Sequence, residues 1–278
     1  MPQEPWLETY RGTVFRWEVD HNDHFTVAYY LARIADAGRA VLHALDAGPR
    51  PTVDCFIRYQ RELRAGDIMH VESGVIGLER ESLVLGHKLF ESASGELCTT
   101  VEHRVAVTLG TDSRGAAEAR RVPWDGPARE FRPRPHRLDG LRDAARDTVK
   151  LEDVDATGQL SLSAAVHRFS ASNAHVLAAF GLTPAYMRDQ RRGFSTFEFQ
   201  LAMGAAVRAG DLLVVRSGLV HVGNSSMRIL HVMTDARTGA EVASLQQSGV
   251  HFDQDRRRPT PLPDDLRARA LAVLVPTA

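Results

Sequence analysis

Polar and ionisable side chains are crowded into one short segment near the start of the chain. Asp20, Asn22, Asp23 and His24 fall within a stretch of five residues. Thr26 follows at the position expected for the cap of a helix, whose first backbone N–H groups lack partners within the helix. A carboxylate or an imidazole can act as a base or nucleophile, and free N–H groups can hold a developing oxyanion. The segment therefore predicts acyl-transfer or hydrolytic chemistry at a helix N-terminus.

Two other interpretations of this segment stay open. A polar loop that caps a helix through an Asx-type turn would need no catalytic role. A metal site would use His21 and His24 with the neighbouring carboxylates, but no third histidine or cysteine with ligand spacing stands nearby in the sequence. We therefore expect no metal ion and no organic cofactor.

The apolar pattern predicts the element that positions this segment. From Val27 to Leu45, apolar or small residues recur at steps of three and four, which is the stripe of an amphipathic helix. The same steps recur from Leu162 to Phe180, at an offset of 135 residues (162 − 27). Gly48 and Gly181 follow the two stripes, as expected for helix ends. The chain is therefore predicted to contain the same long helix twice.

Further matches show that the repeat continues beyond the helix. Arg64–Asp67 recurs as Arg208–Asp211 with identical residues, at an offset of 144 (208 − 64). At the same offset His87 falls on His231, and we expect both histidines to be structural. The larger offset places nine extra residues (144 − 135) after the second helix, within the stretch 183–194. An internal repeat of this length indicates two copies of one structural unit.

Alternating apolar patterns after each helix predict strands. In the first copy they cover residues 55–63, 68–78, 82–91 and 97–109. A first strand is predicted before each helix, at 13–19 and at 147–153. Each copy then has the order β-α-β-β-β-β, which gives an α+β fold with one long helix against an antiparallel sheet. We expect an N-terminal unit over 1–110, a Pro/Arg-rich linker over 111–146 with a short helix at 138–146, and a C-terminal unit over 147–278 that includes a C-terminal tail.

These features resemble the hotdog-fold thioesterases. The segment Asp20-x-Asn22-x-His24, followed by Tyr29–Leu31, is similar to a motif of bacterial acyl-CoA thioesterases and of plant thioesterases that act on acyl carrier protein (ACP). The chain resembles the superfamily that includes the 4-hydroxybenzoyl-CoA and betainyl-CoA types, although the benzoyl-type enzymes have an aspartate where this chain has Asn22. Tyr59–Leu63 is similar to a segment of the acyl-ACP enzymes, but Leu63 replaces their cysteine and excludes a thiol nucleophile there. The resemblance implies a double hotdog, two hotdog units in tandem that supply sheet pairing within one chain.

The resemblance also implies hydrolysis of a thioester, with an acyl-CoA or an acyl-ACP as the substrate. Asn22 and the N–H groups near Phe25 and Thr26 would polarise the carbonyl, while His24 and Glu62 would position or activate water. Asp20 would orient His24 or Asn22, or serve as the base itself. Attack by water and attack by a carboxylate through an anhydride both stay open. The expected catalytic residues are Asp20, Asn22, His24 and Glu62, and the expected substrate-binding residues are Trp17, Phe25, Thr26, Tyr30, Arg191 and Arg192.

The second copy lacks most of these groups. The residues that align with the four expected catalytic residues are Asp155, Thr157, Gln159 and Ala206. Only the first aspartate is retained. We therefore expect the second copy to be a structural partner that builds a wall of the substrate pocket.

Composition and charge exclude several classes of protein. Apolar residues are 44% and charged residues 25% of the chain, as in ordinary globular proteins. The 34 basic and 35 acidic residues give a net charge of −1, so no strong field favours nucleic acid or an anionic membrane. No apolar stretch reaches the ~18 residues of a membrane span, and the N-terminus has no secretory signal pattern. We expect a cytoplasmic protein with a small-molecule acyl-CoA substrate and no nucleic-acid or membrane partner, and a homodimer of double hotdogs.

Two rival functions stay open from the sequence. A hotdog hydratase would add water to an enoyl thioester with an aspartate–histidine pair. A non-catalytic protein would bind an acyl-CoA without cleaving it. Water addition without thiol release would identify the first, and binding without turnover the second.

Overall fold

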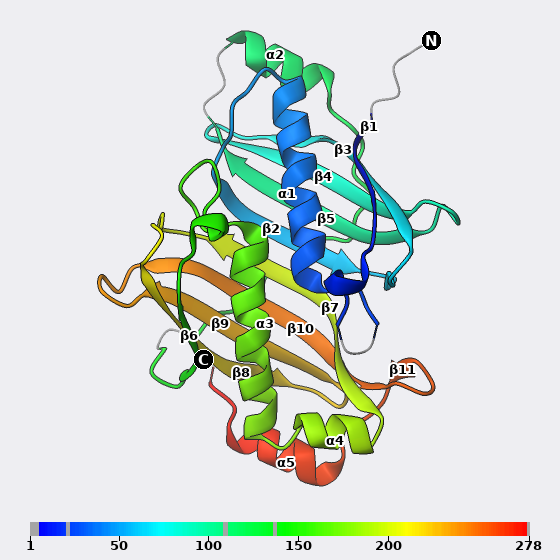
Figure 1. Cartoon of the computed structure of the whole chain (residues 1–278), viewed down its shortest axis with the longest axis vertical. Helices are drawn as coiled ribbons and strands as arrows, with labels where there is room; N and C mark the ends of the chain where they lie inside the picture. Colours follow the sequence, from blue (N-terminus) through cyan, green and yellow to red (C-terminus); the bar gives the residue numbers. More distant parts are fainter. Residues whose placement is uncertain (1–5, 21–22, 108–110, 136–137, 277–278) are drawn as a thin grey trace. The chain divides into compact units, whose positions relative to one another are not determined.

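The computed structural model describes residues 6–20, 23–107, 111–135 and 138–276, with the side chains of 111–113 left out (Figure 1). The chain divides into two compact units. The first contains Met1–Arg129 and Asp155–Val166, and the second contains Glu130–Val154 and His167–Ala278.

In the first unit, helix α1 (Val27–Ala44) lies across one antiparallel sheet (Figure 1). The helix begins at the predicted residue because its apolar stripe starts there. Its buried side, which includes Ile34 and Val41, packs toward the strands, where Val75, Leu85 and Val105 are also buried. The strand order is β1-β3-β4-β5-β2, formed by β1 (Leu7–Thr13), β2 (Thr52–Tyr59), β3 (Ile68–Leu78), β4 (Ser82–Glu91) and β5 (Leu97–Ala106).

The second unit repeats this sheet. Its strand order is β6-β8-β9-β10-β7, formed by β6 (Arg142–Thr148), β7 (Arg192–Met203), β8 (Leu212–Val222), β9 (Ser226–Asp235) and β10 (Glu241–Asp253), and the short β11 (Arg258–Pro259) pairs with β10. The repeated helix is α3 (Leu162–Ala179), followed by α4 (Pro184–Asp189) in the nine-residue insertion and by α5 (Asp264–Ala272) near the C-terminus.

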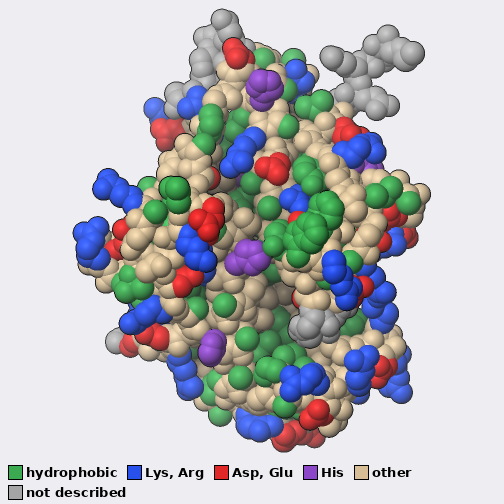
Figure 2. Space-filling view, viewed as in Figure 1, with side chains coloured by type: hydrophobic (Ala, Val, Ile, Leu, Met, Phe, Trp, Pro, Cys, Tyr) green, Lys and Arg blue, Asp and Glu red, His purple; other side chains and the backbone are tan. Residues whose placement is uncertain are grey.

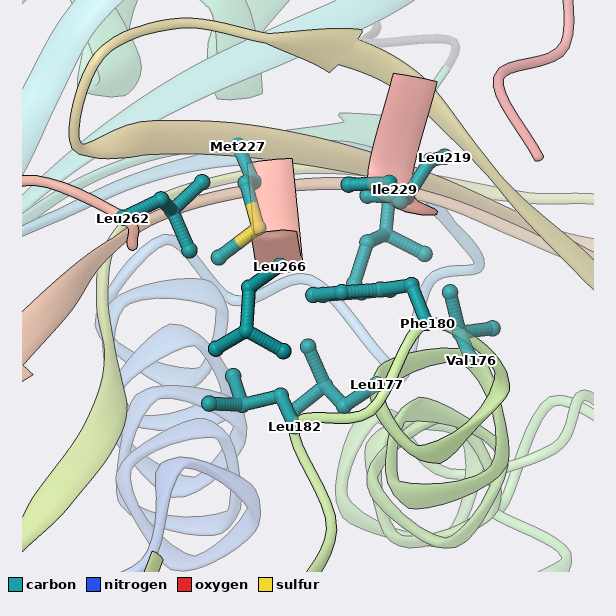
Figure 3. Packing of buried hydrophobic residues seen from close by; sticks show 10 residues of the cluster. Val176, Leu177, Phe180, Leu182, Leu219, Met227, Ile229, Leu262 and Leu266 are labelled. Carbon is teal, nitrogen blue, oxygen red and sulfur yellow. The ribbon is translucent and has the colours of Figure 1, made fainter. Parts of the chain in front are cut away.

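The core of the second unit is an apolar cluster between helices and sheet. Figure 3 shows side chains from the end of α3, from β8 and β9, and from α5 pointing toward one another. All of them are nearly inaccessible to solvent, and burial of such side chains stabilises the unit by roughly 1.5 to 3 kcal/mol each. The labelled residues are Val176, Leu177, Phe180, Leu182, Leu219, Met227, Ile229, Leu262 and Leu266.

The first strand of each copy begins earlier than the sequence predicts. β1 covers Leu7–Thr13 instead of 13–19, and β6 covers Arg142–Thr148 instead of 147–153. The predicted strand residues instead include a 3-10 turn in each copy, at Arg16–Glu18 and at Leu151–Asp153. In both turns the last residue is a carboxylate that accepts a hydrogen bond from the backbone N–H three residues earlier, at 3.0 and 2.9 Å. This local cap ends the extended chain.

The short helix predicted at 138–146 is wrong. Residues from Arg142 onward form β6, which pairs with β8 at the edge of the sheet. Leu141 and Ala144 are buried there, so packing against the sheet overrides the helix preference of alanine and arginine.

The Pro/Arg-rich connection carries helix α2 (Thr111–Ala119), and three of its arginines pair with carboxylates of strands. In the first unit, Arg129 contacts Asp54 at 2.8 Å. In the second unit, the Nε of Arg132 is 3.2 Å from a carboxylate oxygen of Glu198, and Arg134 contacts Glu241 at 2.6 Å. The carboxylate partners therefore compensate the charge of these three guanidinium groups locally. Figure 2 likewise shows Lys and Arg side chains interspersed with Asp and Glu over the visible face.

Within the described ranges, no helix combines the length and the apolar character needed to cross a bilayer.

Candidate active site

The expected site lies where the chain enters α1. Thr26 is the N-cap residue of α1, as the sequence predicts, but its hydroxyl makes no capping hydrogen bond. The Thr26 hydroxyl oxygen is buried and has no hydrogen-bond partner among the described residues. The described part of the chain also offers no acceptor to the N–H groups of Val27 and Ala28, which open the helix. Two backbone donors and one buried hydroxyl at this helix start therefore have no partner among the described residues.

The loop before the helix is folded around the Asp20 carboxylate. Its Oδ1 accepts a hydrogen bond from the His24 N–H at 3.0 Å, and the Asp20 N–H donates to the His24 carbonyl at 2.8 Å. Asp23 adopts a left-handed conformation (φ 63°), which closes the turn between them. Asp20 therefore fixes the backbone of the residue that carries the imidazole.

His24 and Glu62 are in direct contact. His24 Nε2 lies 3.2 Å from Glu62 Oε2, and the two side chains are 22% and 29% exposed. A neutral imidazole that donates one N–H to the carboxylate satisfies this geometry. The pair is therefore held together yet reached by solvent, as a site that activates water requires.

Leu63 brings Glu62 to His24. The Leu63 carbonyl accepts the N–H of Phe25 at 2.7 Å, and the Leu63 N–H donates to the Tyr30 hydroxyl at 3.2 Å. Both bonds join the segment after β2 to the start of α1, so Glu62 must stand beside the histidine loop. No local pattern in the sequence signals this, because both bonds use backbone groups of a fully buried leucine.

One predicted role is not supported by this geometry. The sequence suggests that the N–H groups of Phe25 and Thr26 hold the oxyanion. The Phe25 N–H donates to the Leu63 carbonyl and the Thr26 N–H donates to the Glu18 carbonyl at 3.0 Å, so neither is available. The N–H groups without a partner in the described part of the chain are those of the next two residues, Val27 and Ala28.

The remaining predicted residues have varied surroundings. Asn22 lies outside the described residues. Phe25 and Tyr30 are buried, with ring centroids 4.6 Å apart, and the Tyr30 hydroxyl positions Leu63. Trp17 is 72% exposed and stacks on Phe15. The substrate contacts of these residues stay predictions.

Arg191 and Arg192 lie in the second unit, and each is already ion-paired. Arg191 contacts Asp255 at 3.1 Å, and Arg192 contacts Asp253 at 3.2 Å. Guanidinium groups with carboxylate partners are less available to phosphates, so this pairing disfavours the predicted role in substrate binding.

The equivalent loop of the second copy has the same fold but different groups. Asp155 Oδ1 accepts hydrogen bonds from the N–H groups of Thr157 and Gln159 at 2.8 and 3.2 Å, as Asp20 does for His24. Gln159, in the place of His24, is buried, and its amide bonds both the N–H and the carbonyl of Thr52, at 2.9 and 3.2 Å. Ala206 replaces the glutamate. The amide is therefore used to hold backbone, which agrees with a structural role.

Within the described residues, no group of three or more His, Cys, Asp and Glu side chains is arranged to hold a metal ion.

Comparison with models of protein families shows to which family the chain belongs. A model described as "Thioesterase-like superfamily" matches residues 14–127 and 149–270. The chain belongs to the thioesterase-like superfamily. The model matches twice, which confirms the internal repeat, and the first match contains Asp20, His24 and Glu62. No curated protein matches the chain in sequence.

Solved structures of thioesterases share the fold over nearly the whole chain. An acyl-ACP thioesterase from Bacteroides thetaiotaomicron VPI-5482 has a TM-score of 0.65 at 12% identity, covering 87% of this chain and 96% of its own. A putative oleoyl thioesterase from Lactobacillus plantarum has a TM-score of 0.69 at 10% identity, covering 92% and 97%. The 12:0-ACP thioesterase from Umbellularia californica has a TM-score of 0.64 at 12% identity, covering 92% and 95%. These matches confirm the double hotdog fold.

The structural role inferred for Gln159 in the second copy can be tested by substitution. Gln159→Leu should lower the free energy of unfolding by about 2 to 4 kcal/mol, because the buried N–H and carbonyl of Thr52 lose their partner. Any thioesterase activity should keep its kcat. Urea unfolding and thiol release would measure the two effects, with Gln190→Leu, at an exposed glutamine, as the control. A lost kcat with unchanged stability would instead place Gln159 in catalysis.

Proposed function

We propose that the protein hydrolyses the thioester of an acyl-CoA at the His24–Glu62 pair. The observation that carries the proposal is the 3.2 Å contact between these side chains, beside the start of α1. Membership of the thioesterase-like superfamily supports the reaction class. The free N–H groups of Val27 and Ala28 and the unpartnered Thr26 hydroxyl supply donors for a carbonyl oxygen at the same place.

In the proposed reaction, a water molecule attacks the thioester carbon while the His24–Glu62 pair accepts its proton. The carbonyl oxygen becomes an oxyanion and is held by the N–H groups of Val27 and Ala28, and by the Thr26 hydroxyl. Preorganised donors of this kind contribute about 3 to 4 kcal/mol each to barrier lowering. The intermediate then collapses, the C–S bond breaks, and the proton passes from the pair to the leaving thiolate. Asp20 keeps the imidazole in place through the His24 N–H.

The compartment and the assembly are part of the same proposal. Cys55 and Cys98 are both buried free thiols, which favours a reducing compartment such as the cytoplasm. A homodimer of double hotdogs, predicted from the sequence, would be tested by light scattering.

The test is free-thiol release from a panel of acyl-CoAs with short, long, aromatic and betainyl acyl groups. Wild type and Asp20→Ala would be assayed side by side, with circular dichroism as the control for folding. We expect release from one acyl class and its loss in the variant. No release from any member by a folded protein would contradict the proposal. Hydration of crotonyl-CoA without thiol release would assign a hydratase instead.

A further inference from the structure

Two aromatic side chains beside the proposed site form an exposed stacked pair. The rings of Phe15 and Trp17 have centroids 4.6 Å apart and an interplanar angle of 4°. Trp17 is 72% exposed and Phe15 46% exposed. The outer face of such a stack is a flat apolar surface. Because the two side chains are already ordered, little of their conformational entropy remains to be lost when a ligand binds.

The pair stands on a rigid turn that is tied to the histidine loop. The Phe15 N–H donates to the Glu18 carboxylate at 3.0 Å, and the buried Glu18 pairs with Arg33 of α1. Arg16, between the two rings in sequence, contacts Asp23 at 2.6 Å. The rings are therefore held at a fixed place next to the His24 loop.

The second copy shows that the fold does not require the aromatic rings. Its turn Leu151–Asp153 has the same cap, from the Lys150 N–H to the Asp153 carboxylate at 2.9 Å, and the same partner arginine, Arg168, at 2.7 Å. Yet Lys150 and Glu152 stand in place of the two aromatic residues. Only the copy that carries His24 and Glu62 presents the stacked pair, so the pair belongs with the function of that copy.

An exposed arginine belongs to a segment whose backbone is hydrogen-bonded to the residue before Phe15. The Gly66 N–H donates to the Val14 carbonyl and the Val14 N–H donates to the Asp67 carbonyl, both at 2.9 Å, so the segment after Glu62 runs beside Phe15. This segment carries Arg64, which is exposed and has no ion-pair partner in the described part of the chain. The Arg16 side chain is 80% exposed, with one nitrogen on Asp23. An unpaired guanidinium group such as that of Arg64 can bind phosphate, and an aromatic ring can stack on a purine, so the two together suit a nucleotide.

We propose that the Phe15–Trp17 pair stacks on the adenine of coenzyme A, with Arg64 facing its phosphates. This proposal rests on the proposed hydrolysis of an acyl-CoA and selects CoA as the carrier. A protein carrier would need roughly 800 Å² of matching surface on each partner, far more than two side chains provide. Trp17 and Asp20 are three residues apart, so their Cα atoms are within about 11 Å. The flexible pantetheine arm is long enough to join a nucleotide on the rings to a thioester at His24.

The test compares acyl-CoA with acyl-pantetheine carrying the same acyl group, which lacks the nucleotide. Trp17→Ala should raise KM for acyl-CoA by about tenfold to hundredfold, the range that corresponds to the loss of one base–aromatic stack. The kcat/KM for acyl-CoA divided by that for acyl-pantetheine should fall by the same factor. Trp17→Phe should restore much of this ratio. Leu151→Ala, at the exposed apolar residue of the equivalent turn, is the matched control and should leave the ratio unchanged.

A binding measurement separates this proposal from the proposed function. Adenosine 3′,5′-diphosphate should bind the wild type and quench Trp17 fluorescence, and should bind Trp17→Ala at least tenfold more weakly. Absence of binding to the wild type would overturn the nucleotide site, even if thioesters are hydrolysed. An equal loss of kcat/KM with acyl-CoA and with acyl-pantetheine in Trp17→Ala would also overturn it. Binding without thiol release from any substrate would support the nucleotide site and contradict hydrolysis.

Discussion

Replacing Glu62 with glutamine should lower kcat for thioester hydrolysis by about two to four orders of magnitude, the usual contribution of a general base. Glutamine has the shape of glutamate, and its amide oxygen still accepts the N–H of His24, but it cannot take a proton from water. The free energy of unfolding should change by less than about 1 kcal/mol, because the pair is partly exposed to solvent. Thiol release under saturating substrate would measure the loss.

The matched controls use other residues of the same chain. Glu79→Gln removes a carboxylate that pairs with Arg104 in the same unit and should keep full activity. His24→Gln introduces the residue that the second copy has at this position, and should lose as much activity as Glu62→Gln. If Glu62→Gln kept the wild-type kcat, the His24–Glu62 pair would not be the proton acceptor, and Asp20 would be the remaining carboxylate candidate.

The long helices could be predicted from the sequence because their signal is local. The apolar stripe 27–45 corresponds to α1 (Val27–Ala44), and the stripe 162–180 corresponds to α3 (Leu162–Ala179). The first strands could not be placed in this way. β1 and β6 lie at sheet edges and have weak alternation, while Phe15 and Trp17 alternate like strand residues but are exposed beside a turn.

The site could be predicted only in part. The motif places Asp20 and His24 on one loop, but the approach of Glu62 depends on backbone bonds of Leu63 to Phe25 and Tyr30. The same distant bonds decide which N–H groups are free. Phe25 lies closest to the motif, yet its N–H is used to hold Leu63. The sequence motif therefore identifies the candidate site residues. Which of their groups can act depends on contacts between segments that are distant in the sequence.

Buried histidines at matched strand positions are the second feature with a large expected effect. His87 and His231 face Ser73 and Ser217 across neighbouring strands, and each ring accepts or donates a hydrogen bond to that serine, at 2.6 and 2.7 Å. His103 lies 3.4 Å from His87 and shares a hydrogen bond with Thr52. This agrees with the structural role that the repeat predicts for His87 and His231.

Burial keeps these imidazoles neutral. It lowers the pKa of His103 from 6.5 to about 4 and that of His231 to about 3, and burial with the neighbouring His103 holds the pKa of His87 well below its usual range. The unfolded chain binds protons near pH 6.5, whereas the folded chain does not. Stability from these groups is therefore fully present above pH 6.5 and is lost as the pH falls toward 4. A lowering from 6.5 to about 4 corresponds to roughly 3 kcal/mol for His103 alone.

The second copy offers a variant that isolates one of these histidines. Gln247 occupies the position of His103, where it bonds His231 at 3.3 Å and Thr196 at 2.7 Å. His103→Gln should therefore fold, with its amide placed between His87 and Thr52. Urea unfolding between pH 7 and pH 5 should show the free energy of wild type falling more steeply than that of the variant, by up to about 1.4 kcal/mol per pH unit. Parallel curves would mean that His103 is protonated in the folded protein. A steeper wild-type curve would show that the buried histidines make the fold sensitive to mild acid.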